Sequence, residues 1–321
     1  MPNRPIVAVT RDLPGEIIIP GAELRVGGED VIPRDELLGF VKGASGMIAW
    51  VTERIDAELI EAAGEQLKVV ANYAVGHDNI DMDACRERGV IITNTPDAVT
   101  EGTANHAIGL MLAAARRLVE GDRYIRSGGW VRRGVLGPKE FIGLDISGKT
   151  MVVLGAGRIG YATALRARAF GMRVAYVARS QRPLFESEPV SGERVSLDDG
   201  LAQGDVLSIH CPLTDQTRHM IDAAALAKMK PTAILVNTAR GPIVDEAALG
   251  DALKNRRIWA AGLDVFEDEP RVHPDLVGLD NVVMTPHFGS AEIRYREEMT
   301  RMACANVEAV LNGKEPPNRV V

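Results

Sequence analysis

Short apolar runs alternate with helical patterns from one end of this chain to the other. In the N-terminal third, strand candidates rich in Val and Ile occupy residues 6–9, 46–50, 67–72 and 90–94. Helix candidates opened by Asp occupy residues 56–63 and 81–88. A strand followed by a helix, repeated, predicts a parallel sheet with helical crossovers. Residues 14–33, broken by Gly and Pro, give no assignment.

The same alternation returns in the second half of the chain. Strand candidates there occupy residues 150–154, 173–177, 206–210, 233–237, 260–265 and 282–284. Six strands with intervening helices predict a complete doubly wound sheet. Between the halves, an apolar stripe predicts one long helix over 101–126, which would brace two domains or a dimer, and a final helix is expected over 291–311. The predicted fold class is therefore α/β, with two parallel sheets.

Length and composition agree with two globular domains. A chain of 321 residues exceeds the size at which one hydrophobic core stops growing, and 46% hydrophobic with 25% charged residues is ordinary for a globular protein. A net charge of -7 without a basic stripe argues against a nucleic-acid partner, and no apolar run approaches the ~18 residues of a membrane span. The lack of such a run predicts a soluble protein. The three cysteines, Cys85, Cys211 and Cys304, are far apart and lack metal-ligand or CxxC spacing, so we expect a reduced cytoplasmic setting and no metal site.

A glycine-rich turn follows the strand candidate 150–154 and opens a helix. Its residues are Gly155, Ala156, Gly157, Arg158, Ile159 and Gly160. In a GxGxxG turn the first glycine permits the tight turn, the second lets backbone approach a pyrophosphate, and the third allows close helix–strand packing. The alternative is a glycine turn without a ligand. The order strand, turn, helix, strand favours a dinucleotide site, with the pyrophosphate at the helix N-terminus.

The residues after the next strand candidate indicate which dinucleotide binds. An NAD-selective site carries Asp or Glu there, whereas this chain has Ala178, Arg179 and Ser180. Arg179 can form charge-assisted hydrogen bonds to a 2′-phosphate, and Ser180 can add another. We therefore predict that NADPH is preferred and that NADH remains possible. For Arg182 the interpretation as a solvated surface charge is slightly favoured over a phosphate contact.

Three polar groups lie in the loops that follow strand candidates of the second sheet. Carboxyl ends of strands in an open α/β sheet are where ligands bind. We predict that Arg240 holds a substrate carboxylate, that His287 donates a proton, and that Glu269 keeps His287 protonated by raising its pKa. Taken singly, each residue has an alternative interpretation: Arg240 as a surface charge, Glu269 as part of a solvated acidic loop, and His287 as the cap of a turn. Their joint occurrence in one sheet favours 2-oxo acid reduction.

Further cofactor contacts are expected at the same strand ends. Asp264 is predicted to hydrogen-bond the nicotinamide carboxamide rather than to act as an acid or base. The full predicted set beyond the glycine-rich turn and residues 178–180 is Cys211, Pro212, Thr238, Ala239, Arg240, Asp264, His287 and Gly289. His77, in a possible substrate loop, stays undecided.

The quoted segments resemble the D-isomer-specific 2-hydroxyacid dehydrogenase family along nearly the whole chain. The resemblance is carried by residues 72–81, 155–160, 210–214, 237–241, 264–270 and 286–290. It implies that the family's catalytic Arg, Glu and His fall on Arg240, Glu269 and His287. It also implies that backbone amides of Val75 and Gly76 hold the substrate carboxylate, with Ser290 nearby.

The resemblance further implies the domain organisation. A discontinuous, flavodoxin-like substrate domain would comprise residues 1–99 and 290–321, and a Rossmann cofactor domain would comprise 100–289, with the active site in a cleft between them. Family members are usually homodimers joined through the cofactor domain. Residues 132–138 lack the tryptophan that some relatives insert across the dimer to shape the substrate pocket.

Within the family, the chain looks most similar to glyoxylate and hydroxypyruvate reductases. We therefore expect reduction of glyoxylate, hydroxypyruvate or both with NAD(P)H. Reductases for 2-ketogluconate, pyruvate or phenylpyruvate are alternatives. A dinucleotide-sensing corepressor that binds peptides is an alternative of a different class, since the same fold serves that purpose.

Overall fold

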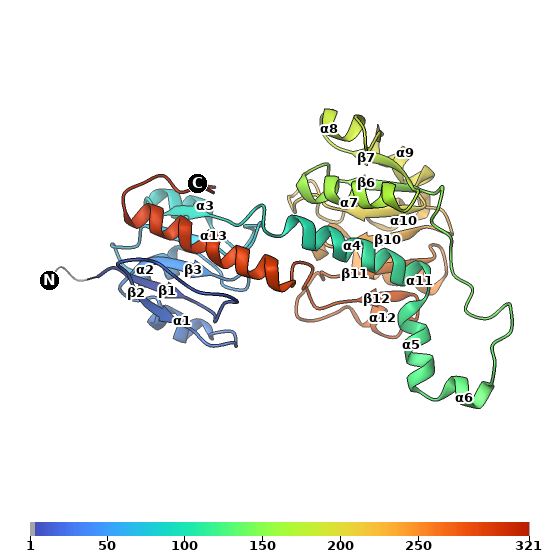
Figure 1. Ribbon diagram of the computed structural model, residues 1–321, viewed down its shortest axis with the longest axis horizontal. Coiled ribbons are helices and arrows are strands. Elements are labelled where there is room, and N and C mark those ends of the chain that lie inside the picture. The colour runs from blue at the N-terminus through green and yellow to red at the C-terminus, as the bar shows by residue number, and fades with distance from the viewer. Residues whose placement is uncertain (1–3, 321) are drawn as a thin grey trace. The chain divides into compact units, whose positions relative to one another are not determined.

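The computed structural model describes residues 4–320 of the chain (Figure 1). These residues form two compact units. Unit 1 comprises the described residues of Met1–Val99 and Ser290–Val321, and unit 2 comprises Thr100–Gly289. Each unit contains one parallel sheet with helices, so the predicted α/β class with two parallel sheets is confirmed. The assignment of substrate binding to one unit and cofactor binding to the other stays a prediction.

The sheet of unit 1 has five parallel strands in the order β2-β1-β3-β4-β5. Its strands are β1 (Ile6–Val9), β2 (Glu23–Val26), β3 (Ala44–Ala49), β4 (Val69–Asn72) and β5 (Ile91–Thr93). The order is that of flavodoxin-like sheets. Strand β2 lies within residues 14–33, where the residue pattern predicts no element. It is a largely exposed edge strand, so it lacks the apolar run that identifies the others.

Four helices accompany this sheet: α1 (Arg34–Phe40), α2 (Ala57–Ala63), α3 (Met82–Glu87) and α13 (Ile293–Leu311). Asp side chains start two of them, because Asp56 accepts from the amide of Leu59 and Asp81 accepts from the amide of Ala84. Helix α13 packs on β3 and β4. A Cβ at Gly46 would come within 2.9 Å of Val307, so this glycine lets helix and strand approach closely.

The sheet of unit 2 has seven parallel strands in the order β12-β11-β10-β9-β6-β7-β8. They are β6 (Thr150–Leu154), β7 (Arg173–Val177), β8 (Glu193–Arg194), β9 (Val206–Ile209), β10 (Ile234–Asn237), β11 (Ala260–Leu263) and β12 (Val282–Met284). This is the Rossmann order with one strand added at the end. The six expected strands are present. The seventh, β8, consists of two exposed charged residues, which no apolar pattern can indicate.

Helices cover both faces of this sheet over two buried apolar clusters. They are α4 (Thr100–Ala115), α5 (Leu118–Arg126), α6 (Gly129–Arg133), α7 (Arg158–Ala169), α8 (Pro183–Glu186), α9 (Leu197–Gln203), α10 (Ala223–Lys228), α11 (Glu246–Lys254) and α12 (Pro274–Val277), with a 3-10 turn at Gly241–Ile243. Among residues 4–320, no helix is both long enough and apolar enough to cross a membrane.

The prediction of a single long helix over 101–126 is wrong, because the structure has two helices there. Arg117 adopts a left-handed conformation with φ of 55°, which separates α4 from α5. Its guanidinium holds this bend, because Nε and Nη2 donate to the Glu120 carboxylate at 2.7 and 2.6 Å and the group lies 5.1 Å from the centre of the Phe141 ring. Helix α4 packs on β10 and β11, whereas α5 buries no residue and extends with α6 away from the sheet (Figure 1).

Candidate active site

The carboxyl edge of the unit 2 sheet brings the three predicted catalytic residues together. Arg240 follows β10, Glu269 lies in the loop after β11, and His287 follows β12. Nδ1 of His287 lies 2.8 Å from Oε2 of Glu269. The positive charge of Arg240 also acts on that carboxylate. The trio is therefore assembled entirely within unit 2.

Glu269 is held in one orientation. Its Oε1 accepts a hydrogen bond from the amide of Phe266 at 2.9 Å, while Oε2 faces His287. Burial alone would raise the pKa of Glu269, but the bond with His287 and the nearby Arg240 lower the pKa below its usual value. An ionised carboxylate can only accept, so Nδ1 of His287 donates to Glu269, and Nε2 is the ring nitrogen left for another partner.

The loop that carries Arg240 is tied to its own strand and to the neighbouring loop. Nδ2 of the buried Asn237 donates to the Arg240 carbonyl at 2.9 Å, and its Oδ1 accepts from the amide of Ala239 at 3.0 Å. A Cβ on Gly241 would fall 1.9 Å from the carbonyl carbon of Phe266. Backbone of the Arg240 loop therefore contacts backbone of the Glu269 loop. Asn237 was not among the predicted site residues, although its position at the strand end was visible.

The glycine-rich turn has the features that a dinucleotide requires. Gly155 has φ of 104°, and a Cβ there would lie 2.5 Å from the amide nitrogen of Cys211. A Cβ on Gly160 would lie 2.3 Å from the carbonyl oxygen of Gly155. By contrast, a Cβ on Gly157 would meet no atom within 4 Å, and no side chain caps α7. The helix N-terminus is thus open to a pyrophosphate, which fits the predicted cofactor.

Other strand ends agree with a bound dinucleotide. Among residues 4–320, the buried Oγ1 of Thr238 has no hydrogen-bond partner, so it can accept from or donate to a bound ligand. Burial raises the pKa of Cys211 to about 11, so its contribution beside Gly155 is packing and backbone rather than thiolate chemistry. Within the same residues, no three His, Cys, Asp or Glu side chains gather in a metal-binding arrangement.

Basic side chains surround the end of β7. Arg179 and Ser180 are exposed there, as the 2′-phosphate prediction requires. Arg194, on the overlooked β8, donates from Nη2 to the carbonyls of Ala178 and Arg179, each at 3.0 Å. Arg194 thereby holds residues 178–180, which are predicted to contact the 2′-phosphate. The amide of Arg182 donates to the Tyr176 hydroxyl at 2.9 Å, which places the start of α8 beside this loop.

Beyond Arg240, the other residues predicted to lie at the substrate carboxylate belong to unit 1. Val75 and Gly76 follow β4, and Ser290 precedes α13. Asn94 donates to the carbonyl of Val75 at 3.0 Å, and Asn72 donates to that of Gly76 at 2.6 Å. Two asparagine side chains therefore hold the loop in a defined conformation.

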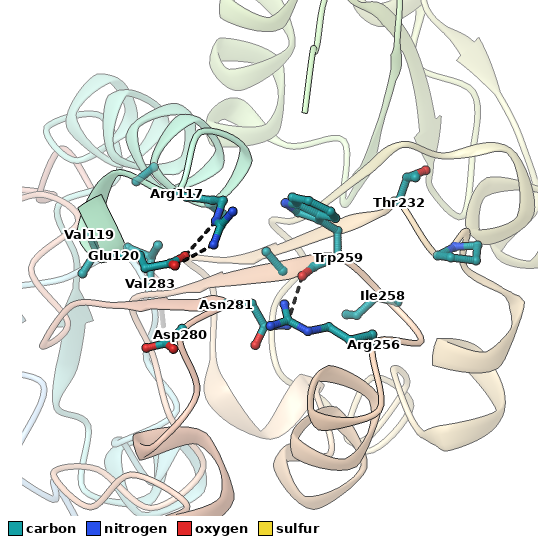
Figure 2. Close-up of a pocket in the computed structure, with 14 residues that line it drawn as sticks. Arg117, Val119, Glu120, Thr232, Arg256, Ile258, Trp259, Asp280, Asn281 and Val283 are labelled. Atoms are coloured by element: carbon teal, nitrogen blue, oxygen red, sulfur yellow. Dashed lines mark hydrogen bonds and ion pairs between the residues drawn. The ribbon is translucent and has the colours of Figure 1, made fainter. Parts of the chain in front are cut away.

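A cavity of about 610 Å³ lies at the opposite edge of the unit 2 sheet (Figure 2). Its walls include Thr232, Trp259 and Asn281, which precede β10, β11 and β12, and Arg117 and Glu120 at the start of α5. In Figure 2 Arg117 points to Glu120, and Asn281 donates to the Trp259 carbonyl at 3.0 Å. Arg240, Glu269 and His287 follow the other ends of these strands, so this cavity lies away from them.

A Rossmann sheet with an uncapped glycine-rich turn, together with an Arg, Glu and His group at its carboxyl edge, defines an oxidoreductase that uses a nicotinamide dinucleotide. The family model described as "D-isomer specific 2-hydroxyacid dehydrogenase, NAD binding domain" matches residues 108–289. The chain belongs to the D-isomer-specific 2-hydroxyacid dehydrogenase family, as its sequence motifs predicted.

Full-length relatives agree with this family. A glyoxylate reductase of Thermococcus kodakarensis is 46% identical, over 99% of this chain and 96% of the relative. The solved TT0316 protein of Thermus thermophilus is 45% identical with a TM-score of 0.92, covering 98% of this chain and 100% of that one. An NADPH-dependent glyoxylate/hydroxypyruvate reductase of Sinorhizobium meliloti, solved with NADP and malonate, is 33% identical with a TM-score of 0.83, covering 99% and 97%. The chain is an NAD(P)-dependent oxidoreductase that acts on 2-oxo acids.

Proposed function

We propose that this protein reduces glyoxylate, hydroxypyruvate or both to the 2-hydroxy acid, with His287 as proton donor, Glu269 as its support and Arg240 as the carboxylate anchor. The observation that carries the proposal is the 2.8 Å contact between His287 and an ionised Glu269, on which Arg240 also acts. The names of the relatives support the choice of substrate.

The division of labour follows from the chemistry of each side chain. When bound, the reduced dinucleotide would supply the hydride for C2 of the substrate. As the carbonyl bond becomes an alkoxide, Nε2 of His287 gives it a proton, and Glu269 stabilises the cationic ring before that transfer. Arg240 offers a planar pair of donors to the substrate carboxylate. We assign further carboxylate contacts to the amides of Val75 and Gly76, with Ser290 nearby.

We also propose that NADPH is preferred over NADH. Support comes from Arg179 and Ser180 at the end of β7, where an acid would repel a 2′-phosphate, and from Arg194, which holds their loop. Arg179→Ala should raise KM for NADPH and leave KM for NADH nearly unchanged. Equal losses with both cofactors would contradict the assignment. The predicted contacts of residues 155–159, Asp264 and Gly289 with the dinucleotide, and the cytoplasmic location, stay predictions.

We further propose that a second copy of this chain covers the segment from α5 to residue 142. This segment exposes six large apolar side chains: Leu118, Ile125, Trp130, Val131, Val135 and Ile142. Val131 is 90% exposed and Val135 is 86% exposed, an arrangement typical of an association surface. Val131→Asp should shift the mass measured by light scattering from dimer to monomer, while Val277→Asp, at another exposed valine, should not. A wild-type monomer would refute the proposal.

The experiment that tests the proposed reaction is a matrix of kcat/KM values. Glyoxylate, hydroxypyruvate, pyruvate, phenylpyruvate and 2-ketogluconate are each assayed with NADPH and with NADH. We expect the highest values for glyoxylate or hydroxypyruvate with NADPH. A higher kcat/KM for pyruvate, phenylpyruvate or 2-ketogluconate would contradict the proposed substrate but not the proposed roles of Arg240, Glu269 and His287. Absence of turnover with all five would overturn the proposed function.

A further inference from the structure

The proton donor lies in an unusual backbone conformation. His287 has φ of 50°, in the left-handed region that residues with side chains seldom adopt. Such a conformation persists only where the surrounding structure determines it. The contact with Glu269 holds the imidazole ring but leaves the backbone of the turn to other groups.

The His287 amide donates to the Thr285 carbonyl at 3.0 Å, and Asp264 binds the turn at three consecutive amides. The carbonyl oxygen of Asp264 accepts from the amide of His287 at 2.8 Å. Its carboxylate accepts from the next two amides, with Oδ1 3.0 Å from the nitrogen of Phe288 and Oδ2 2.8 Å from that of Gly289. Consecutive amides that converge on one anion form a nest, here with a carboxylate of the chain as the anion.

The Asp264 carboxylate is in turn held by Thr285 and by His106, which lies on α4. The Thr285 hydroxyl donates to Oδ1 of Asp264 at 2.7 Å. Because this donation uses the only hydroxyl proton, Nε2 of His106, 2.9 Å from Thr285 Oγ1, carries a proton and donates it. The same Nε2 lies 3.3 Å from Oδ1 of Asp264. Hydrogen bonds therefore converge on the Asp264 carboxylate, from His106 and Thr285 on one side and from the amides of Phe288 and Gly289 on the other.

Packing leaves His106 and this turn little freedom. The His106 ring meets the edge of Phe288 with ring centres 5.1 Å apart. A Cβ on Gly289 would lie 2.9 Å from Asp264 Oδ2, so glycine is required for the carboxylate to reach the amide. Burial would raise the pKa of Asp264, but the hydrogen bonds from His106 and Thr285 lower the pKa overall, so the carboxylate stays ionised.

We propose that His106 is a positioning residue for proton donation, which acts through Asp264 to hold the left-handed turn of His287. The proposal rests on the proposed function, in which His287 is the donor. Two clamps then hold His287: Glu269 orients its ring, and the pair of His106 and Asp264 holds its backbone. The polar contacts of His106 are with Thr285 and Asp264, which hold the turn rather than the substrate, so its removal should slow proton transfer more than it weakens substrate binding.

The test compares His106→Ala with His106→Gln and with Met111→Ala, which removes a fully buried α4 side chain that packs in the core. For His106→Ala we expect kcat to fall about 10-fold to 100-fold with KM nearly unchanged, and the solvent deuterium isotope effect on kcat to rise. His106→Gln, whose amide can donate to Thr285, should recover most of kcat. Met111→Ala should lower stability without changing the isotope effect.

A second measurement does not depend on turnover. Hydrogen exchange of the Phe288 and Gly289 amides, followed by NMR, should accelerate at least 10-fold in His106→Ala relative to Met111→Ala, because only the former loosens the turn. Wild-type kcat together with wild-type exchange in His106→Ala would overturn the proposal. If the wild-type protein reduces no 2-oxo acid, the proposed function fails, whereas the exchange comparison still decides whether His106 holds the turn.

Discussion

The two edges of the unit 2 sheet differ in how their side chains are held. At the carboxyl edge, Asn237, Asp264 and Glu269 each form hydrogen bonds with backbone amides, and their loops touch through Gly241. At the amino edge, strands β10, β11 and β12 begin beside a cavity of about 610 Å³, and exposed Arg256 and Asp280 lie on its wall. That cavity therefore lies at the edge away from Arg240, Glu269 and His287. The two edges thus differ in their hydrogen bonding: backbone amides fix the side chains of the carboxyl edge, whereas the amino edge borders a cavity.

The largest loss of activity is expected from His287→Ala. Removal of the proton donor should lower kcat about 100-fold to 10,000-fold, since a positioned general acid contributes on that scale. Initial rates of NADPH oxidation at saturating substrate measure the effect. His273→Ala, at a histidine that starts α12, should leave kcat unchanged. Near-wild-type turnover of His287→Ala would show that His287 is not the proton donor.

A smaller loss is expected from Gly241→Ala. The added Cβ would overlap Phe266 at 1.9 Å, so the loops of Arg240 and Glu269 must separate. Displacement of catalytic groups by about 1 Å costs on the order of 100-fold in kcat/KM. Gly278→Ala is the matched control, because a Cβ there meets nothing within 4 Å. Equal activity of the two variants would show that the backbone contact between the loops is dispensable.

Asp264→Asn should change stability in a way that depends on pH. The variant places amide hydrogens against the amides of the His287 turn, so the free energy of unfolding should drop by about 3 kcal/mol at neutral pH. Since the folded-state pKa of Asp264 is lowered, its contribution is complete above the unfolded pKa of ~3.9 and disappears as pH falls through the lower folded value.

Urea unfolding of the wild type and of Asp264→Asn at several pH values measures that contribution. The difference between the two proteins should be constant near neutrality and shrink below about pH 4. A difference that stayed the same down to acid pH would mean that the loss comes from packing rather than from the ionised carboxylate.

The smallest effect is expected at the amino edge. Asp280→Asn changes an exposed carboxylate on the cavity wall, so kcat should stay within about 2-fold and the free energy of unfolding within about ±0.5 kcal/mol. Steady-state kinetics and thermal unfolding check both values. A loss of turnover comparable to that of Gly241→Ala would show that the two edges are coupled.

Sequence patterns predicted the strands of both sheets well where these strands are buried. Strands such as β6 and β10 are continuous apolar runs, because helices cover both faces of a parallel sheet. The edge strands β2 and β8 escaped prediction, since an edge strand exposes polar side chains and pairs through backbone. The break at Arg117 also escaped, because contacts with Glu120 and Phe141 hold its left-handed conformation.

The site divides in the same way. Arg240, Glu269 and His287 were recognisable because each places a reactive group after a strand, and parallel strands bring such positions to one edge. Arg194 and His106 were not recognisable as parts of the site. Each bonds to another segment of the chain, Arg194 to the carbonyl of Ala178, 16 residues away, and His106 to Thr285, 179 residues away.

The sequence by itself determined the fold class, the glycine-rich turn and the chemical identity of the trio, because these depend on local periodicity, on glycine at required positions and on side-chain type. Only the tertiary structure decided how close the predicted partner Glu269 lies to His287 and which residues hold the His287 backbone. Those relations are distances of about 3 Å between segments many residues apart. Periodicity carries no information about such distances, since many packings satisfy the same apolar pattern.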